Sequence, residues 1–568
     1  MEEVNSEYQV HSYGGEKWRD SRATDYLSPD FGCHQDDIPN EGFLFSKYQL
    51  KEQQEEKILD YELLNDTRVD IDSPPLETCL EEIAKLGEIP PVISDVEAKK
   101  KKGCPISLAA LELLKNYGGG VKKMKGERVK EPCNDKTSNE ANKLSTDEIL
   151  RIAGTRFIQS SSQPADHVPS MLSHPFESSF YGLSYEESKD VELVELLLSC
   201  AEKVGCEQFE RGSKLLNQCY QLCSNSGNPV QRVVHYFCEA LRERIDKETG
   251  RNIALSSLTQ QQFDPDKAMM TLNAQHYAFH QEVPFSQLSL FAGLQAIIEN
   301  VAEAKKIHII DLGIRSGLQW TVLMQALASS HESQLELLKI TALGTTSKHL
   351  IEETGERLSS FAKTMNIPLS FKILMVSDMS HLIEDLFELD ADEKVAVYSS
   401  FLLRRFLSEP DQLESVMNVI RSLNPCVMVV IEVEANHNSP FFVNRFIEAL
   451  FYYGALFDCL ETFMKRDDEN RMISESLYFG QGIRNIVATE GKQRKIRHVT
   501  IDVWRSFFAR FGMEGAELSS SSLYQAKLII QKFSCEASCA LDVNAKCLIV
   551  RWKGTPILSL SVWKFVKY

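Results

Sequence analysis

The stretch from Ile307 to Trp320 constrains the fold of this chain more than any other segment. Its sequence, IHIIDLGIRSGLQW, places an isoleucine-rich run before an acidic residue, two glycines four positions apart and the start of a new helix. Nucleotide-binding α/β domains begin in this way, because glycines let the backbone turn tightly and approach a ligand closely. We therefore predict a Rossmann-like sheet, with Asp311, Gly313 and Gly317 as the candidate ligand turn.

Apolar runs and helical segments alternate after this stretch. The expected strands are Ile307–Ile310, Leu338–Leu343, Phe371–Val376, Val395–Tyr398 and Val427–Val433. The expected helices between them are Gly317–Ser329, Lys348–Met365, Met379–Glu388 and Pro410–Leu423. Continuous apolar strands that alternate with helices indicate the α/β class, with a mostly parallel sheet covered by helices on both faces.

Two further regions precede this core. From about residue 191 to residue 300, leucines and valines recur at helical spacing, which predicts an all-helical cap. Residues 1–182 mix acidic clusters, glycine runs and a Ser/Pro-rich stretch, a texture typical of a disordered arm with short helices. One such helix is predicted at LSTDEILRIA, where Ser145 and Glu148 form a capping box. The folded domain is thus expected at 183–568, with its α/β core at 301–568.

The charge balance limits the classes of function. The chain has 568 residues, of which 81 are acidic and 62 are Lys or Arg, so its formal net charge is -19. Sequence-blind binding of nucleic acid relies on Lys and Arg to neutralise phosphates, and this balance argues against it. The start of the chain is polar, and no apolar run approaches the ~20 residues of a membrane helix, so we expect neither a secretory signal nor a membrane role.

The 14 cysteines lie mostly inside apolar segments, which predicts reduced core residues rather than a disulfide framework. Two C-x-x-x-C pairs, Cys219/Cys223 and Cys535/Cys539, could each share a helix face. No matching second pair of ligands stands near either one in the sequence, so we expect no bound metal.

Four consecutive lysines, Lys99, Lys100, Lys101 and Lys102, lie in the N-terminal arm. Short lysine-rich runs suit nuclear import receptors or nucleic acid, and an ordinary solvated charge run fits the same pattern equally well. This run is the candidate nuclear import signal.

The first helix of the expected cap carries Leu193, Leu196 and Leu197 in the pattern L-x-x-L-L. Leucines in this pattern can dock into a groove on a partner protein. The same leucines also lie at core spacing, which favours burial inside the cap. They are the candidate interaction residues, and a mixed role is compatible with both patterns.

Five segments resemble, in order, the leucine-rich, VHIID, PFYRE, RVER and SAW segments of the plant GRAS family of transcriptional regulators. They are VELVELLLSCAEKV, FAGLQAIIENVAEAKKIHIID, EVEANHNSPFFVNRFIEALFYYGALFDCLE, GQGIRNIVATEGKQRKIRH and the C-terminal segment that holds Ser561-Val562-Trp563. The resemblance implies a nuclear regulator. It would act through other GRAS proteins, as a homo- or heterodimer, and through DNA-binding transcription factors, so that its contact with DNA is indirect.

The chain also departs from the family pattern. Tyr398-Ser399 stands where the family commonly has Asn-Ser, and Arg404 stands where a histidine is common. The N-terminal arm shows neither the DELLA nor the TVHYNP motif of the gibberellin-sensing branch. The texture of LSTDEILRIAGTRFI and of the core resembles instead the branch that holds regulators of symbiosis and arbuscule development.

The competing interpretation is a Rossmann-type small-molecule-binding protein or an S-adenosylmethionine-dependent methyltransferase. Such an enzyme needs a carboxylate after its second strand to bind the ribose hydroxyls, whereas here the second strand runs into Gly344, Thr345 and Thr346. No catalytic base, nucleophile or methyl-acceptor motif follows the fourth strand. We therefore assign no catalytic residue and no cofactor, and we favour a structural role for the turn at Asp311.

Three further features after the fifth expected strand are candidates for a functional or structural role. His437 follows an expected strand, where it could act as a base or a metal ligand, although a turn-orienting role is favoured. Trp563 is expected in the core. The densest basic group of the folded domain is Lys492, Arg494, Lys495, Arg497 and His498. On a surface loop this group could contact DNA phosphate, but a solvated loop or pairing with acidic residues is favoured.

Overall fold

The computed structural model describes residues 110, 112–114, 143–161, 183–251, 274–329, 335–345 and 347–566. The lysine run at residues 99–102 lies outside the described residues, so its role in nuclear import stays a prediction. Of the helices that are described, none combines the length and the apolar character that a membrane span requires.

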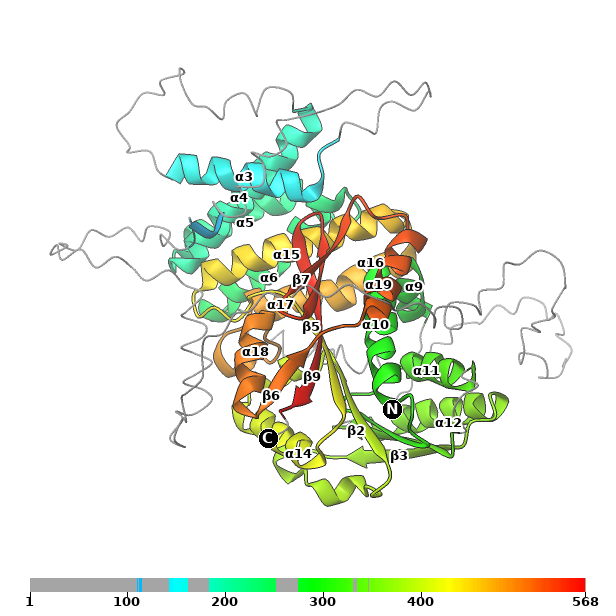
Figure 1. The fold of residues 1–568 in the computed structure, drawn as a ribbon. Coiled ribbons are helices and arrows are strands. Elements are labelled where there is room, and N and C mark those ends of the chain that lie inside the picture. Colours follow the sequence, from blue (N-terminus) through cyan, green and yellow to red (C-terminus); the bar gives the residue numbers. More distant parts are fainter. Residues whose placement is uncertain are drawn as a thin grey trace, which may run out of the picture. The chain divides into compact units, whose positions relative to one another are not determined.

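A mixed sheet of nine strands forms the centre of the described chain (Figure 1). Its strands are β1 (Lys306–Asp311), β2 (Leu337–Gly344), β3 (Leu369–Met375), β4 (Lys394–Ser400), β5 (Val427–Val433), β6 (Met513–Ala516), β7 (Cys539–Asn544), β8 (Cys547–Trp552) and β9 (Thr555–Phe565). Their order across the sheet is β3-β2-β1-β4-β5-β9-β8-β7, and β6 also pairs with β9. Pairs among β1 to β5 are parallel, whereas every pair that involves β6 to β9 is antiparallel.

Helices surround this sheet. The α-helices are α3 (Thr146–Ser161), α4 (Tyr185–Gly205), α5 (Phe209–Leu222), α6 (Pro229–Glu248), α9 (Ala274–Glu282), α10 (Pro284–Val301), α11 (Leu318–Ser329), α12 (Lys348–Thr364), α13 (Leu403–Phe406), α14 (Pro410–Leu423), α15 (Phe442–Phe463), α16 (Glu469–Ser474), α17 (Gln481–Val487), α18 (Ile501–Arg510) and α19 (Ser520–Lys532). Short 3-10 helices occur at η4 (Met379–His381), η5 (Glu384–Phe387) and η7 (Gly491–Gln493), and η6 (Glu475–Gly480) is a π-helix.

The parallel half of the sheet confirms the predicted α/β core, since each expected strand coincides with one of β1 to β5 to within two residues. The single helix expected at Met379–Glu388 is wrong, because the segment forms η4 and η5 with an extended Ile383 between them (φ -133°). Asp378 turns the chain at the start by accepting a hydrogen bond from the Ser380 backbone N (2.9 Å). Both short helices bury an apolar side chain in the core, Met379 and Phe387.

Strand β5 shows why both faces of the sheet are covered. All seven of its residues are buried. Val429 and Ile431 join one apolar core, whereas Met428 and Val430 join a second one on the opposite face. Because successive side chains of a strand point to opposite faces, a continuous apolar run fits a strand with helices on both sides. Helices α10 and α15 contribute to the first core, and α14 and α18 contribute to the second.

The described residues between 183 and 301 form helices and turns without a strand, as expected for an all-helical cap. Helix α4 starts with a capping box, in which Ser184 accepts a hydrogen bond from the Glu187 backbone N and Glu187 accepts one from the Ser184 backbone N. Figure 1 shows α4 and α5 beyond α15, on the side away from β2 and β3.

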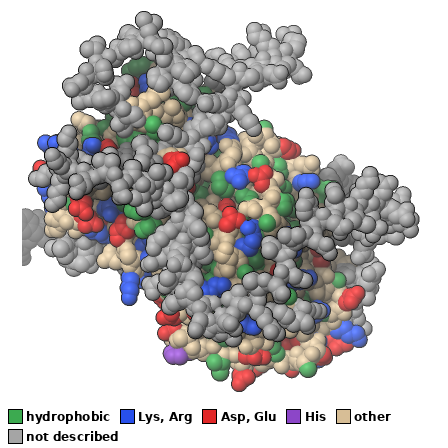
Figure 2. Space-filling view, turned by 60° about the vertical axis from the view of Figure 1, so that its left-hand side comes forward, with side chains coloured by type: hydrophobic (Ala, Val, Ile, Leu, Met, Phe, Trp, Pro, Cys, Tyr) green, Lys and Arg blue, Asp and Glu red, His purple; other side chains and the backbone are tan. Residues whose placement is uncertain are grey.

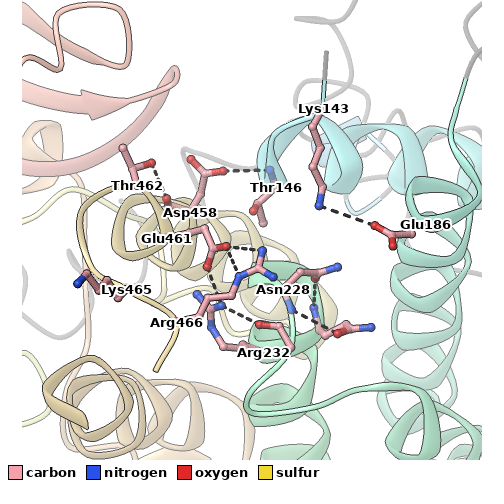
Figure 3. Close-up of polar contacts among 12 residues, drawn as sticks. Lys143, Thr146, Glu186, Asn228, Arg232, Asp458, Glu461, Thr462, Lys465 and Arg466 are labelled. Carbon is pink, nitrogen blue, oxygen red and sulfur yellow. Dashed lines mark hydrogen bonds and ion pairs between the residues drawn. The ribbon is translucent and has the colours of Figure 1, made fainter. Parts of the chain in front are cut away.

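Helix α3 precedes the expected start of the folded domain at residue 183, yet it packs against α4 and α15. Its predicted capping box is present: the Glu148 carboxylate accepts a hydrogen bond from the Ser145 backbone N (2.7 Å), and Ser145 Oγ accepts one from the Glu148 backbone N (3.3 Å). The Thr146 backbone N donates to Asp458 Oδ1 of α15 (3.1 Å; Figure 3). Leu150 is buried in the first core, so α3 belongs to the folded body.

Trp563 joins the antiparallel half of the sheet to the second core. Its side chain is 1% exposed, and its ring centroid lies 4.6 Å from that of Phe508 on α18. The indole Nε1 donates a hydrogen bond to Ser561 Oγ (2.8 Å), which satisfies its polar atom inside the core. The ring therefore fixes β9 against α18.

Replacing Trp563 with alanine is expected to lower the free energy of unfolding by roughly 3–5 kcal/mol, because it leaves a cavity between β9 and α18. Thermal melting of the full chain, followed by circular dichroism, measures the loss. Leu222→Ala is the control, because this leucine at the end of α5 is 59% exposed and should cost little. Equal melting temperatures for W563A and the natural chain would contradict the assigned core position.

Candidate functional site

Asp311 ends β1 and organises the turn that leads into α11. Its Oδ1 accepts a hydrogen bond from the Gly313 backbone N (3.1 Å), and its Oδ2 accepts from Gln319 Nε2 (3.0 Å) and from Trp320 Nε1 (2.9 Å). The side chain is 1% exposed, and burial raises the pKa of its carboxyl group to about 6. These donors all come from the chain itself, so the carboxylate is committed to holding the turn.

The two glycines of the turn have different roles. Gly317 has a positive φ of +72°, and a Cβ at this position would lie 2.8 Å from Thr354 Cγ2 and 3.1 Å from Leu358 Cδ1 of α12. Gly313 lies under Leu402, whose Cδ1 would be 3.2 Å from a Cβ added there. Leu402 therefore covers the glycine at the place where a nucleotide would have to approach the backbone.

The end of β2 is largely filled as well, and the cavity that remains there between Gly313, Gly344 and Leu402 has a volume of only about 40 Å³. A Cβ on Gly344 would lie 2.3 Å from Ile351 Cδ1 and 3.1 Å from Met375 Sδ, so α12 and β3 pack directly against this residue. Neither Gly344 nor Thr345 carries a carboxyl group. A ribose would thus meet packed apolar side chains at the point where a dinucleotide-binding domain presents an acidic residue.

A cavity of about 280 Å³ lies beside the turn, at the carboxyl ends of β1, β4 and β5. Residues of α9, α10, α15, η6 and α17 form much of the rest of its walls, together with residues of α11, of β9 and of the segment around His498. The aromatic residues of the lining are Phe279, Phe285, Tyr398, Phe401, Tyr452, Tyr453, Tyr478 and Phe479. Open α/β sheets bind ligands at this edge, and small-molecule sites are mostly apolar with a few polar groups. The candidate ligand turn therefore borders a cavity through Gly313, whereas Asp311 and Gly317 do not line it.

The charged side chains in this lining are those of Arg315 and Arg404; the described residues contribute no Asp, Glu or Lys to it. Both guanidinium groups lie near the Phe401 ring, at 5.6 and 5.4 Å from its centroid. Arg404 Nη1 lies 3.4 Å from His498 Nε2, and its buried Nε has no hydrogen-bond partner among the described residues. Behind them, burial raises the pKa of Glu432 to about 7, so this carboxyl group is only partly ionised near neutral pH.

His437 and His498 form a buried pair beside the cavity, with their Nδ1 atoms 2.8 Å apart. Burial lowers the pKa of His437 to about 3 and also lowers that of His498 well below its ordinary value, so both rings are neutral. The His437 ring stacks on Tyr453 at 6.3 Å, which supports the turn-orienting role. Among the described residues, no group of three His, Cys, Asp or Glu side chains is placed to bind a metal.

The basic group at residues 492–498 is only partly on the surface, which corrects the surface-loop interpretation. Lys492 and Lys495 are exposed, but Arg494 and His498 are buried. Arg494 donates a hydrogen bond to the His437 carbonyl (3.3 Å), and Arg497 donates one to Asn438 Oδ1 (3.0 Å) and another to the Gly491 carbonyl (2.9 Å). The arginines thus fasten this segment to the loop after β5 and are not directed at phosphates.

The L-x-x-L-L leucines lie on α4. Leu193 and Leu197 are buried in the first core, and Leu196 is half-buried against it. While α4 keeps its place in the cap, a partner protein could reach Leu196 but neither of the other two. An interaction role for all three leucines stays a prediction.

The residues that make the cavity aromatic and positively charged were not predicted from the sequence. Arg404 was noted only as a departure from a family pattern, and neither Phe401 nor Glu432 was a candidate. One signal was available: Phe401 and Arg404 directly follow β4, so they reach the same sheet edge as Gly313.

The comparison with known families is decisive for the class of protein. The family described as the GRAS domain family matches residues 193–564. The chain belongs to the GRAS domain family. DELLA protein RGL1 from Arabidopsis thaliana is 33% identical over 376 residues, which cover 66% of this chain and 70% of that protein. DELLA protein RGL3 from the same plant is 32% identical over 381 residues, with the same two shares.

The solved structure of SCL7 from Oryza sativa shares the fold of this GRAS domain, with a TM-score of 0.58 and 27% identity. It covers 66% of this chain and 99% of the SCL7 chain. The likeness confirms the predicted α/β class with a mostly parallel sheet. The resemblance seen in the five sequence segments is confirmed at the level of the plant GRAS family.

Replacing Gly317 with alanine is expected to destabilise the chain by about 2 kcal/mol or more, because the new Cβ meets Thr354 and the backbone holds a positive φ. Gly491→Ala is a matched control, since Gly491 also has a positive φ (+52°) but has open space around it. Thermal melting should rank G317A below G491A. Adding Thr354→Ser, which removes the crowded methyl group, should recover part of the loss in G317A. Equal effects of the two alanines would show that the contact with α12 is unimportant.

Replacing Glu432 with glutamine is expected to stabilise the chain near pH 8 by about 1–3 kcal/mol and to have little effect near pH 5. Burial raises the folded-state pKa of this group from 4.5 to about 7, so its stabilising proton is lost as the pH rises through 7. Melting temperatures measured at several pH values give the difference. Glu356→Gln on the exposed face of α12 is the control. A constant difference between E432Q and the natural chain would contradict the raised pKa.

Proposed function

We propose that this GRAS chain is a nuclear transcription regulator that acts through contacts with other GRAS proteins and with DNA-binding transcription factors, and not through catalysis. One observation carries the choice against an enzyme. The sheet edge has the outline of a nucleotide site, but Leu402 covers Gly313, and Ile351 with Met375 closes the end of β2. A nucleotide cofactor therefore lacks both the open glycine turn and the acidic residue that such domains use.

The proposal makes contact with DNA indirect. The net charge is -19, and two members of the densest basic group, Arg494 and His498, are buried. On the face drawn in Figure 2, acidic and basic side chains are interspersed wherever the described surface is visible. Proteins that bind DNA phosphates directly need a clustered basic surface, so a DNA-binding partner fits this distribution better.

We further place the chain outside the DELLA branch, in the group that regulates symbiosis and arbuscule development. The matches to the DELLA proteins RGL1 and RGL3 cover 66% of this chain, and residues 1–182 contain neither the DELLA nor the TVHYNP motif. The segment that supports this group, residues 144–158, includes most of α3, and buried residues of that helix such as Leu150 belong to the core of the domain.

Affinity purification of the tagged full chain from plant cell nuclei tests the proposal. We expect other GRAS proteins and transcription factors among the captured partners, and we expect fluorescence of a fused reporter in the nucleus. Neutralising the four lysines at residues 99–102 with glutamine should shift that fluorescence towards the cytoplasm. The matched control neutralises four exposed lysines of the core, namely Lys305, Lys348, Lys363 and Lys546.

Calorimetric titration of the full chain with S-adenosylmethionine tests the competing methyltransferase interpretation. We expect no binding, for the steric reasons given above. Micromolar binding that disappears in Gly313→Trp would revive the methyltransferase alternative. Unchanged nuclear fluorescence after neutralisation of the lysine run would instead remove only the assigned import signal.

A further inference from the structure

We propose that the cavity beside the Asp311 turn binds a small, mostly apolar molecule that carries a single carboxylate. This ligand site would add to the regulator role and does not depend on which partners the chain binds. The proposal rests on a combination of features in the cavity: aromatic walls, two arginines at one side, and a buried guanidinium nitrogen without a hydrogen-bond partner among the described residues.

The charge of the lining opposes the charge of the chain. Acidic residues outnumber Lys and Arg by 81 to 62, yet the charged side chains that the described residues give to this lining are Arg315 and Arg404. The Arg404 guanidinium contacts the neutral His498 ring and the Phe401 ring face, and its charge also lowers the pKa that burial raises in the nearby Glu432 carboxyl group. A guanidinium group whose Nε is buried without an acceptor carries a cost in free energy. An anionic ligand in the cavity would offset part of this cost through a charge-assisted hydrogen bond with the half-buried guanidinium group.

The remaining walls fit the apolar body of such a ligand. Phe279 and Phe285 line the cavity together with Tyr478 and Phe479 of the π-helix, and the rings of Phe279 and Phe479 meet edge-on with centroids 6.2 Å apart. The volume of about 280 Å³ is near the lower end of the range of roughly 300–1,000 Å³ for small-molecule sites. Most of the lining is apolar or aromatic, with uncharged polar side chains such as Ser289 and Asn485 between the rings, so one charged group on a compact, mostly apolar skeleton matches the lining.

Two uncommon backbone features border the same cavity. Phe401 has a φ of +54°, which is costly for a bulky residue. The π-helix η6 presents Tyr478 and Phe479, and π-helical turns occur frequently at functional sites. These two features present the side chains of Phe401, Tyr478 and Phe479 to the cavity.

Titration of the full chain with naphthoate, an aromatic monocarboxylate, tests the proposal. Naphthamide, which has the same skeleton without the charge, is the comparison ligand, and ligand-detected nuclear magnetic resonance gives both dissociation constants. We expect naphthoate to bind at least about tenfold more tightly than naphthamide, as expected for one charge-assisted hydrogen bond. Absence of naphthoate binding, or equal binding of the two compounds, would overturn the proposal.

Two variants locate the binding. Arg404→Gln should weaken naphthoate binding about tenfold and leave naphthamide unaffected, and Ser289→Phe should block both compounds by filling the cavity. Arg405→Gln is the matched control, since Arg405 lies on the same short helix α13 but does not line this cavity. Melting temperatures check that each variant folds; if S289F does not, R404Q against R405Q still decides. Equal naphthoate binding by R404Q, R405Q and the natural chain would place any binding elsewhere and refute the site.

Discussion

The buried carboxylate of Asp311 is the interaction on which the centre of this domain depends. It ties the end of β1 to the backbone of the next turn and to two side chains at the start of α11. Trp320, one of the two, packs edge-on against Tyr398 of β4, with ring centroids 5.2 Å apart. The carboxylate thus holds the turn, helix α11 and strand β4 together. It does so even though burial in the core makes its negative charge energetically costly.

The Asp311 carboxylate accepts hydrogen bonds from its own chain and not from a ligand. This explains how the sheet edge can resemble that of a nucleotide-binding enzyme without forming a nucleotide site. In a nucleotide-binding domain the glycine turn stays open, because the ligand must reach the backbone amides. Here the turn is satisfied from within and Leu402 lies over Gly313. The open space is displaced towards the helices of the cap, where Arg404, His498 and aromatic rings surround it. The parallel half has the strand order β3-β2-β1-β4-β5 that is common in nucleotide-binding sheets, but its larger cavity lies beside the glycine turn.

Much of the fold could be predicted from the sequence, and the exceptions have physical causes. β1, β2, β4 and β5 are buried along most of their length and are largely apolar, so their sequences stand out from their surroundings. The edge strand β3 is mostly half-buried, but its apolar residues still mark it as a strand. The antiparallel strands β6 to β9 were not predicted. In β7 the last three residues are exposed, and two of them, Asp542 and Asn544, are polar or charged, so the strand does not stand out in the sequence. The segment at Met379–Glu388 has a helix-like spacing of apolar residues, but two of them reach the core from separate short turns.

The site was harder to predict than the fold, because its character depends on contacts between distant segments. Arg404 and His498 are 94 positions apart, and no local pattern indicates that they meet. The sequence also gives the same appearance to Lys495 and Arg494, although one is exposed and the other buried. Burial changes what such residues do: a solvated cation is paired with water, whereas a buried one needs an acceptor from the protein or from a ligand. The net charge of a chain therefore does not predict the charge of a cavity inside it. This chain is acidic overall, yet the charged residues that line its cavity are arginines.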